Sequence, residues 1–228
     1  MKRSEINTII KESLEFIKSM NFALPPFAEW SVDDWSKKGS ECSEIIDNEL
    51  GWDITDFGSG NFSKTGLTLI TLRNGSLKNP KYLKPYAEKI MVVRENQVTP
   101  LHYHYLKYED IINRGGGNLI IQLYNKTEDD RLSDTNVKVS IDGVERVIRS
   151  GETIVLKPGE SICMFAGLYH KFWGESGGGM VLVGEVSKVN DDNIDNHFLE
   201  PVGRFPSIEE DEAPKWLLCN EYSKYIKK

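Results

Sequence analysis

Hydrophobic and polar residues follow two different periods along the chain, and the change comes near residue 50. In residues 4–20, isoleucines and leucines recur at three- and four-residue spacing, which predicts a helix with one apolar face. Ser4 stands at the start of this pattern and is the expected N-cap. The proline pair that begins at Pro25 breaks the pattern, and Ser31, followed by acidic residues, predicts a short second helix.

After residue 52 the chain consists of short runs rich in β-branched residues, and most of them end in Gly, Pro or Asn. Eight of these runs are GLTLITLRNG, EKIMVVREN, NLIIQLYNK, NVKVSIDG, VERVIRSG, ETIVLKPG, ESICMFAG and GMVLVGEVS. Turns are expected at Asn74–Gly75, Asp142–Gly143 and Pro158–Gly159. Many short strands at this spacing predict a mainly β fold, either a sandwich or a closed barrel, rather than an alternating α/β fold.

The length of 228 residues suits one domain, because β-barrels of this size are commonly undivided. We expect residues 1–228 to form a single domain with three parts. Residues 1–50 form a helical N-terminal extension, residues 65–190 approximately form the β-barrel, and residues 191–228 form a C-terminal lid or tail. A short C-terminal helix is expected where four apolar residues can share one face, namely Trp216, Leu217, Leu218 and Tyr222.

Composition excludes several classes of function. The chain has 28 basic and 35 acidic residues and a net charge of −7, with no basic run, so it is not expected to bind nucleic acid. It has no apolar stretch long enough to span a bilayer, and its polar first ten residues do not resemble a secretory signal. Three widely separated cysteines form no CxxC pair, which indicates reduced thiols and a cytoplasmic location.

The stretch VTPLHYHYLKYEDIINRGGG concentrates chemistry, because it holds two of the four histidines in the chain. Side chains alternate faces along a strand, so His102 and His104 are expected to point the same way. Glu109 follows five residues later, and the glycines that begin at Gly115 permit a tight reversal. A third histidine, His170, lies in a later β-rich segment.

Three imidazoles and a carboxylate form a good ligand set for Mn, Fe, Co, Ni or Zn, and they leave positions open on a six-coordinate ion. We therefore treat four residues as candidate metal ligands: His102, His104, Glu109 and His170. The alternative is that the paired histidines are ordinary surface or interface residues.

The spacing of the candidate ligands resembles the two sequence motifs of the cupins. In the first motif the glutamate follows the second histidine after four residues, and Gly116 follows after six more; in the second motif, Gly167 precedes His170 by three positions. Three residues depart from the cupin glycine, proline and asparagine: Asn96, Phe165 and Gly174. The ligand positions match, so the resemblance implies a cupin barrel, also called a double-stranded β-helix or jelly roll, with a bound metal.

Longer stretches resemble the D-lyxose isomerase family of cupin sugar isomerases. They are LPPFAEW, GWDITDFGSGNF, EKIMVVRENQVTPLHYHYLKYEDIINRGGGNL and VSKVNDDNIDNHFLEP. This resemblance implies interconversion of D-lyxose and D-xylulose, and it leaves D-mannose and D-fructose open as a second pair. It also implies a homodimer and a divalent ion, with manganese expected and cobalt, zinc, nickel or iron as alternatives.

Such an isomerase needs acid–base groups and sugar-binding groups beside the metal. Lys107 lies between the histidine pair and the glutamate, and Glu185 is a lone carboxylate in an apolar strand, so both are candidates for catalysis. Lys89, Asp192 and Arg204 are candidates for binding the sugar. The alternatives are solvated lysines, a structural ion pair at Glu185 and an exposed loop for the last two residues.

Two rival functions use the same barrel. An Fe(II)-dependent cupin dioxygenase would share the ligand set but consume oxygen. A non-enzymatic sugar-binding cupin would lack acid–base groups in its pocket. The complete ligand set together with Lys107 favours an enzyme, and the sequence leaves an enediol mechanism and a hydride shift equally open.

Overall fold

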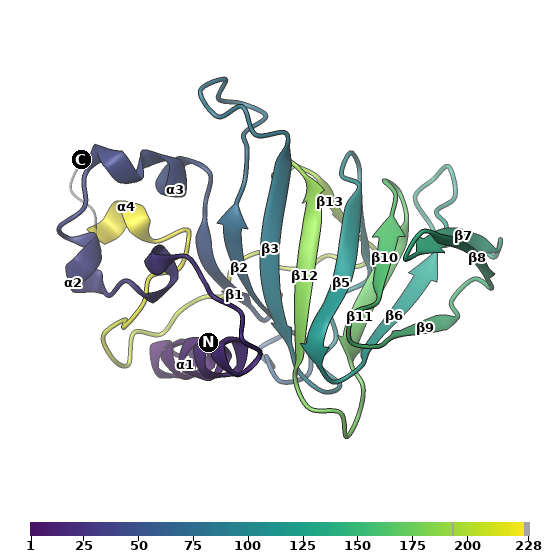
Figure 1. Ribbon diagram of the computed structural model, residues 1–228, viewed down its shortest axis with the longest axis horizontal. Helices are drawn as coiled ribbons and strands as arrows, with labels where there is room; N and C mark the ends of the chain where they lie inside the picture. Colours follow the sequence, from purple (N-terminus) through teal and green to yellow (C-terminus); the bar gives the residue numbers. More distant parts are fainter. Residues whose placement is uncertain (193, 226–228) are drawn as a thin grey trace.

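A computed structural model describes residues 1–192 and 194–225 of the chain. Two antiparallel sheets face each other (Figure 1). The larger sheet has the strand order β1 (Gly51–Thr55), β2 (Leu67–Arg73), β3 (Tyr86–Val93), β12 (Val181–Lys188), β5 (Glu109–Gly116), β10 (Ser161–Met164), β7 (Val137–Ile141) and β8 (Val144–Ile148). The smaller sheet has the order β13 (Asn196–Phe198), β4 (His102–His104), β11 (Tyr169–Gly174), β6 (Leu119–Tyr124) and β9 (Thr153–Leu156).

The helices precede and follow this β region. They are α1 (Arg3–Ser19), η1 (Pro26–Glu29), α2 (Val32–Trp35), η2 (Ser40–Cys42), α3 (Ser43–Asp47) and the short C-terminal α4 (Tyr222–Tyr225). Figure 1 shows them gathered beside β1, with the β7–β8 hairpin at the opposite end of the molecule. The mainly β fold class with N-terminal helices and a short C-terminal helix is therefore confirmed.

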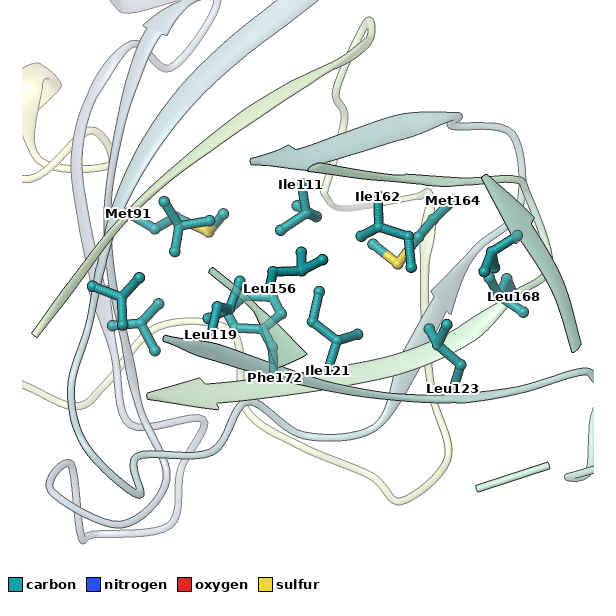
Figure 2. Close-up of a cluster of buried hydrophobic side chains, with 14 of the residues drawn as sticks. Met91, Ile111, Leu119, Ile121, Leu123, Leu156, Ile162, Met164, Leu168 and Phe172 are labelled. Atoms are coloured by element: carbon teal, nitrogen blue, oxygen red, sulfur yellow. The ribbon is translucent and has the colours of Figure 1, made fainter. Parts of the chain in front are cut away.

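The space between the two sheets holds the main hydrophobic core. Figure 2 shows side chains from both sheets converging there, among them Met91, Ile111, Ile121 and Phe172. The chain crosses from β5 to β6 through the predicted glycine reversal. Gly116 has a φ of +89°, and a Cβ at this position would lie 2.2 Å from the carbonyl oxygen of Met180. A larger residue there would clash with the backbone next to β12, the neighbouring strand of the same sheet.

A second apolar cluster lies on the outer face of the larger sheet, where α1 packs. The strand pattern explains why both faces are apolar: on β3, Ile90 and Val92 belong to the outer cluster, whereas Met91 and Val93 belong to the core between the sheets. The helix therefore covers the β1–β2–β3–β12 half of the sheet and leaves the inward positions of those strands to shape the barrel interior.

The two N-terminal helix predictions were correct in position but not in every cap. Ser31 closes a capping box with Asp34 at the start of α2, as the sequence predicts. Ser4 is not the N-cap of α1, because that position is Lys2. Instead Ser4 donates from its backbone and its hydroxyl to the carboxylate of Asp211, at 2.9 and 2.6 Å. The first turn is thus stabilised by an anion from the distant C-terminal segment.

The turn predictions had mixed outcomes. Asp142 and Gly143 both have positive φ and join β7 to β8 as a two-residue hairpin, and Gly159 has a φ of +97° in its turn. The Asn74–Gly75 prediction was wrong, since residues 74–85 form a long connection between β2 and β3. Asn74 is only 5% exposed and uses its side chain to hold another segment of the chain.

The C-terminal segment also differs from its expected form. Trp216 and Leu218 are extended and form single bridges with Ser31 and Trp52, so they are not part of a helix. The helix begins only at Tyr222, and residues 226–228 of the expected C-terminal lid or tail lie outside the described residues. All three cysteines are free thiols. Within residues 1–192 and 194–225, no helix is both long and apolar enough to cross a membrane.

Candidate active site

Three histidines from the smaller sheet meet inside the barrel. His102 and His104 lie at the two ends of β4, and Tyr103 between them is fully buried on the other face. His170 lies on β11, directly opposite His102 in the antiparallel pairing. One ring nitrogen from each of the three histidines lies within 4.8 Å of the others, which is close enough for one metal ion to bind all three.

Backbone carbonyls orient two of the rings. The Nδ1 atom of His102 lies 2.9 Å from the carbonyl oxygen of Pro100, and that of His170 lies 3.0 Å from the carbonyl oxygen of Leu168. An Nδ1–H that donates to a carbonyl leaves the Nε2 lone pair free for a ligand role. Burial lowers the pKa of His170 to about 4, and burial together with the neighbouring histidines lowers the pKa of His102. Both rings are therefore neutral near pH 7, as metal binding requires.

Glu109, the first residue of β5, supplies the carboxylate of the cluster. Its Oε1 lies 3.2 Å from Nε2 of His170 and its Oε2 lies 3.4 Å from Nε2 of His104. Burial alone would raise the pKa of Glu109, but the ammonium of Lys107 and the nearby histidines hold that pKa well below its usual range. The group is thus an ionised oxygen donor aimed at the histidine nitrogens.

Lys107 and Glu185 form a buried pair beside the cluster. The Nζ of Lys107 lies 2.9 Å from Oε2 of Glu109 and donates to Oε1 of Glu185 at 2.9 Å. Burial opposes charge on Lys107, but the two carboxylates outweigh it and raise its pKa. Burial likewise opposes charge on Glu185, while Lys107 and Lys89 lower its pKa. At neutral pH the pair is therefore an ammonium and a carboxylate in direct contact.

Lys89 reaches the same region from β3, where it pairs with Glu185 across the strands. Its Nζ donates to Oδ1 of Asn190 at 2.9 Å, whereas the carboxylates of Glu185 and Asp192 are 3.5 and 3.7 Å away. Burial opposes charge on Asp192, but Lys89 and Arg204 lower its pKa, so this carboxylate is ionised. A cross-strand ion pair of this kind stabilises both charges in the buried interior.

Arg204 closes the site from the C-terminal segment. It donates to Oδ2 of Asp53 at 2.6 Å and to Oδ2 of Asp192 at 3.2 Å. Asp53 faces inward from β1, and its burial raises its pKa although Arg204 opposes this. Two buried atoms of this wall, Nε of Arg204 and Oδ1 of Asp53, have no hydrogen-bond partner in the described part of the chain.

All nine candidate site residues line one cavity, the inner chamber, at this end of the barrel: Lys89, His102, His104, Lys107, Glu109, His170, Glu185, Asp192 and Arg204. Its remaining wall is largely apolar and includes Phe198, whose ring stacks on that of His102 with centroids 5.3 Å apart. The fourth histidine, His197, lies away from the cluster and stacks on Tyr103.

Sequence reasoning missed three residues of this region: Asp53, Asn190 and Phe198. Asp53 gave a readable signal, because it is a carboxylate between Trp52 and Ile54 in a β-rich run, like Glu185 in its own strand. Asn190 gave none, since an asparagine in a polar loop segment has no periodic pattern. An adjoining outer pocket of about 380 Å³ shares Asp53, Asp192 and Arg204 with the inner chamber and is also lined by Asn190.

Comparison with known proteins assigns this architecture to a family. Residues 1–222 match the family model described as D-lyxose isomerase. The chain is 52% identical over 227 residues to the D-lyxose/D-mannose isomerase of Serratia proteamaculans, covering 99% of this chain and all of the relative. It is also 52% identical over 226 residues to the D-lyxose/D-mannose isomerase of Escherichia coli O157:H7, with the same coverage.

Solved structures support the fold. The L-ribose isomerase of Cellulomonas parahominis with L-ribose superposes with a TM-score of 0.60 over 92% of this chain and 98% of its own, at 16% identity. The L-ribose isomerase of Geodermatophilus obscurus has a TM-score of 0.61, 15% identity and the same coverage. At these identities the likeness concerns the arrangement of the two sheets and the helices.

Proposed function

The chain belongs to the D-lyxose isomerase family, and on this premise we propose that it interconverts D-lyxose and D-xylulose at the inner chamber. It is a sugar ketol-isomerase, and the names of these two relatives extend the proposal to D-mannose, for which the corresponding ketose is D-fructose. The observation that carries the proposal is the three-histidine cluster with Glu109, because it joins a metal-binding geometry to ionised groups in one buried cavity.

The donor set fits a divalent transition metal. Two neutral imidazoles with fixed Nδ1 atoms, a third imidazole and an ionised carboxylate would hold the ion through His102, His170, His104 and Glu109. When bound, such an ion would act as a Lewis acid toward the oxygens on C1 and C2 of the sugar. We propose manganese, with cobalt, zinc, nickel and iron as the alternatives that metal analysis of the purified protein would separate.

Isomerisation moves the hydrogen on C2 to C1 and the hydroxyl proton of C2 to the oxygen on C1. Lys107 is protonated and can donate to a sugar oxygen, while Glu185 is ionised and can accept a proton. The distance of 2.9 Å between Nζ of Lys107 and Oε1 of Glu185 allows a proton to pass between the two side chains without solvent. Lys107 and Glu185 are therefore the proposed catalytic residues.

The remaining polar wall supplies groups for the other sugar hydroxyls. Lys89 carries N–H donors and Asp192 is an acceptor. Arg204 donates to Asp192 and to Asp53, so it is held at the chamber wall. Donors and acceptors fixed in this way would bind a polyol by hydrogen bonds, with the apolar side of the chamber excluding water. These three residues are the proposed substrate contacts.

The proposal also concerns the protein as a whole. We infer a homodimer, which the family resemblance implies and which would cover exposed apolar side chains such as Leu106, Tyr108 and Val186. The free cysteines suit a cytoplasmic location. Sedimentation analysis of the purified protein would measure the subunit number.

An aldose panel tests the function. Metal-loaded protein would be incubated with D-lyxose, D-mannose, D-xylose and L-ribose, and ketose formation and oxygen uptake would be followed in parallel. The proposal predicts ketose from D-lyxose and a slower formation from D-mannose, without oxygen uptake. Oxygen uptake without ketose would identify a dioxygenase, and binding without turnover would identify a sugar-binding protein.

Glu185→Gln separates catalysis from structure. The amide can still accept a hydrogen bond from Lys107 but cannot accept a proton, so turnover of D-lyxose should fall about 100-fold. Circular dichroism and metal content should match the wild type. A variant that fails to fold would make Glu185 a structural member of the ion-pair network.

A further inference from the structure

Asn190 occupies a position that the chemistry of the site has not yet explained. Its Oδ1 accepts from Lys89 at 2.9 Å and from Lys107 at 3.2 Å. Asn190 also contributes to the lowered pKa of the nearby Asp192 carboxyl. One neutral amide oxygen thus faces two ammonium groups.

The geometry around Lys89 shows what the amide adds. The carboxylates of Glu185 and Asp192 attract its ammonium from 3.5 and 3.7 Å, which is beyond normal hydrogen-bond length. An ion pair at that distance fixes little about direction, whereas the 2.9 Å bond to Asn190 does. The amide therefore sets where the lysine points.

Asn190 holds the lysines from outside the chamber. It lines the outer pocket, whereas Lys89 and Lys107 line the inner chamber. A sugar in the chamber would then meet the ammonium groups on the face opposite the amide. A neutral residue suits this place, because a carboxylate there would add a negative charge to the four already present at Asp53, Glu109, Glu185 and Asp192.

A second asparagine fixes Asn190. The Nδ2 of Asn74 donates to the carbonyl oxygen of Asn190 at 2.8 Å, and the backbone N–H of Asn190 donates to Oδ1 of Asn74 at 3.0 Å. This reciprocal pair binds the backbone of a loop residue as a neighbouring strand would. Asn74 is itself held, since its carbonyl oxygen accepts from Nδ2 of Asn48 at 3.2 Å.

Gly75 allows the close approach that this clamp needs. A Cβ at Gly75 would lie 1.8 Å from the carbonyl oxygen of Lys84 and 2.9 Å from a methyl carbon of Val189, the neighbour of Asn190. The Asn-Gly pair is therefore explained by the loop it touches, and not by a hairpin turn.

We propose that Asn190, clamped by Asn74, is a positioning residue that aims the ammonium groups of Lys89 and Lys107 into the inner chamber. The effect on catalysis rests on the proposed function, but the position of the lysines does not. Two measurements keep these claims separate: one on the sugar-free protein and one on turnover.

The first measurement is NMR of lysine ammonium groups in metal-free protein labelled with ¹⁵N-lysine. Buried, hydrogen-bonded ammonium groups exchange slowly with water, so Lys89 and Lys107 should give signals in the wild type. Asn190→Ala and Asn74→Ala should broaden or remove both signals. Asn79→Ala is the matched control, because Asn79 is in the same loop and lines the outer pocket, and its Oδ1 accepts from the backbone of Lys81.

The second measurement is the steady-state kinetics of the same variants with D-lyxose. Asn190→Ala and Asn74→Ala should lower kcat/KM about 10- to 100-fold with unchanged metal content, and Asn79→Ala should resemble the wild type. Asn190→Ala keeps the backbone clamp, so it remains informative if Asn74→Ala does not fold.

The outcomes are distinguishable. Unchanged lysine signals, or a kcat/KM within about twofold of wild type in Asn190→Ala, would overturn the positioning role. Altered lysine signals in a protein whose wild type forms no ketose would keep the positioning role and overturn the proposed function instead.

Discussion

The strands β3, β5 and β12 each carry an ionisable and an apolar residue on the same inward face, two positions apart. The pairs are Lys89 and Met91, Glu109 and Ile111, and Glu185 and Val183. The ionisable member of each pair lines the inner chamber, and the apolar member packs in the core between the sheets, where Figure 2 labels Met91 and Ile111. Met91 and Ile111 also border the chamber. Strand periodicity thus decides which face a side chain takes, but not whether that face serves stability or chemistry.

The inner chamber and the apolar core lie at two ends of the barrel interior, and they differ in the partners that other strands supply. A buried charge is costly unless it is paired, and each lysine, arginine and carboxylate of the chamber has an opposite charge within 4 Å. At the apolar end the partners are hydrocarbon side chains from both sheets. The account therefore predicts that changes at the chamber affect turnover more than stability, and that changes in the core do the reverse.

The largest effect is expected from His104→Ala. Removing one of three converging imidazoles should abolish most metal binding and lower turnover on the order of 1000-fold or more, since a Lewis acid supplies several kcal/mol of the barrier reduction. Metal analysis and D-lyxose kinetics would measure both. His197→Ala is the matched control, because that histidine stacks on Tyr103 outside the cluster. Full metal content in His104→Ala would contradict the ligand assignment.

A smaller loss is expected from Lys107→Met, which keeps most of the side-chain volume and removes the charge. Turnover should fall about 100-fold with metal content intact, because the proposed proton donor is lost. Lys138→Met, on the exposed part of β7, serves as the control. Unchanged kinetics in Lys107→Met would mean that Lys107 has no catalytic role and that its ion pair with Glu185 is purely structural.

Ile121→Ala tests the apolar end. Ile121 is fully buried between the sheets, so its truncation should lower the free energy of unfolding by about 3 kcal/mol. Chemical denaturation would measure this loss. The kcat of the folded variant should stay within about threefold of the wild type. A loss of turnover as large as that of Lys107→Met would show that the two ends are not separable.

The smallest effect is a pH dependence of the metal-free protein. Burial lowers the pKa of His170 to about 4 and also lowers that of His102, so the unfolded chain takes up protons first as the pH falls below 6.5. Stability is therefore fully present above pH 6.5 and is lost below it, by at most about 1.4 kcal/mol per pH unit for each histidine. The pKa values of Glu109, Glu185 and Asp192 are lowered, so these carboxylates change the stability only at still lower pH.

Urea unfolding at pH 7.5, 6.5 and 5.5 would measure this dependence, with His170→Gln as the comparison. The variant should show a shallower decline. A free energy of unfolding that is constant across this range would contradict the neutral, buried state of the two histidines.

Much of the fold and of the ligand cluster could be predicted because local pattern and final structure agree. The HxH spacing on a short strand and the lone Glu185 in an apolar run both survive in the structure unchanged. The C-terminal segment could not be predicted: Leu218 and Tyr222 stand at helical spacing, but Trp216 and Leu218 pair with Ser31 and Trp52. Their conformation depends on distant strands that no local pattern reveals.

The residues that hold the site residues in place could not be predicted from the sequence either. Asn74 fits a hairpin turn by its sequence, yet its side chain clamps Asn190, 116 positions away. Asp53 was missed for a different reason: its place between Trp52 and Ile54 is a readable signal, but the surrounding run is rich in glycine and aromatic residues and suits a loop as well as a strand. Groups that act through side-chain to backbone bonds leave no periodic trace, whereas the candidate metal ligands His102 and His104 do, because their spacing follows strand geometry.

The most direct test of the central claim is metal dependence. Protein stripped with a chelator would be incubated with D-lyxose, with and without added Mn²⁺, and D-xylulose formation would be followed. The account predicts no ketose from the stripped protein and restored formation with Mn²⁺, in wild type but not in His104→Ala. Ketose formation that is unaffected by stripping would contradict it, as would the absence of ketose with manganese, cobalt, zinc, nickel and iron alike.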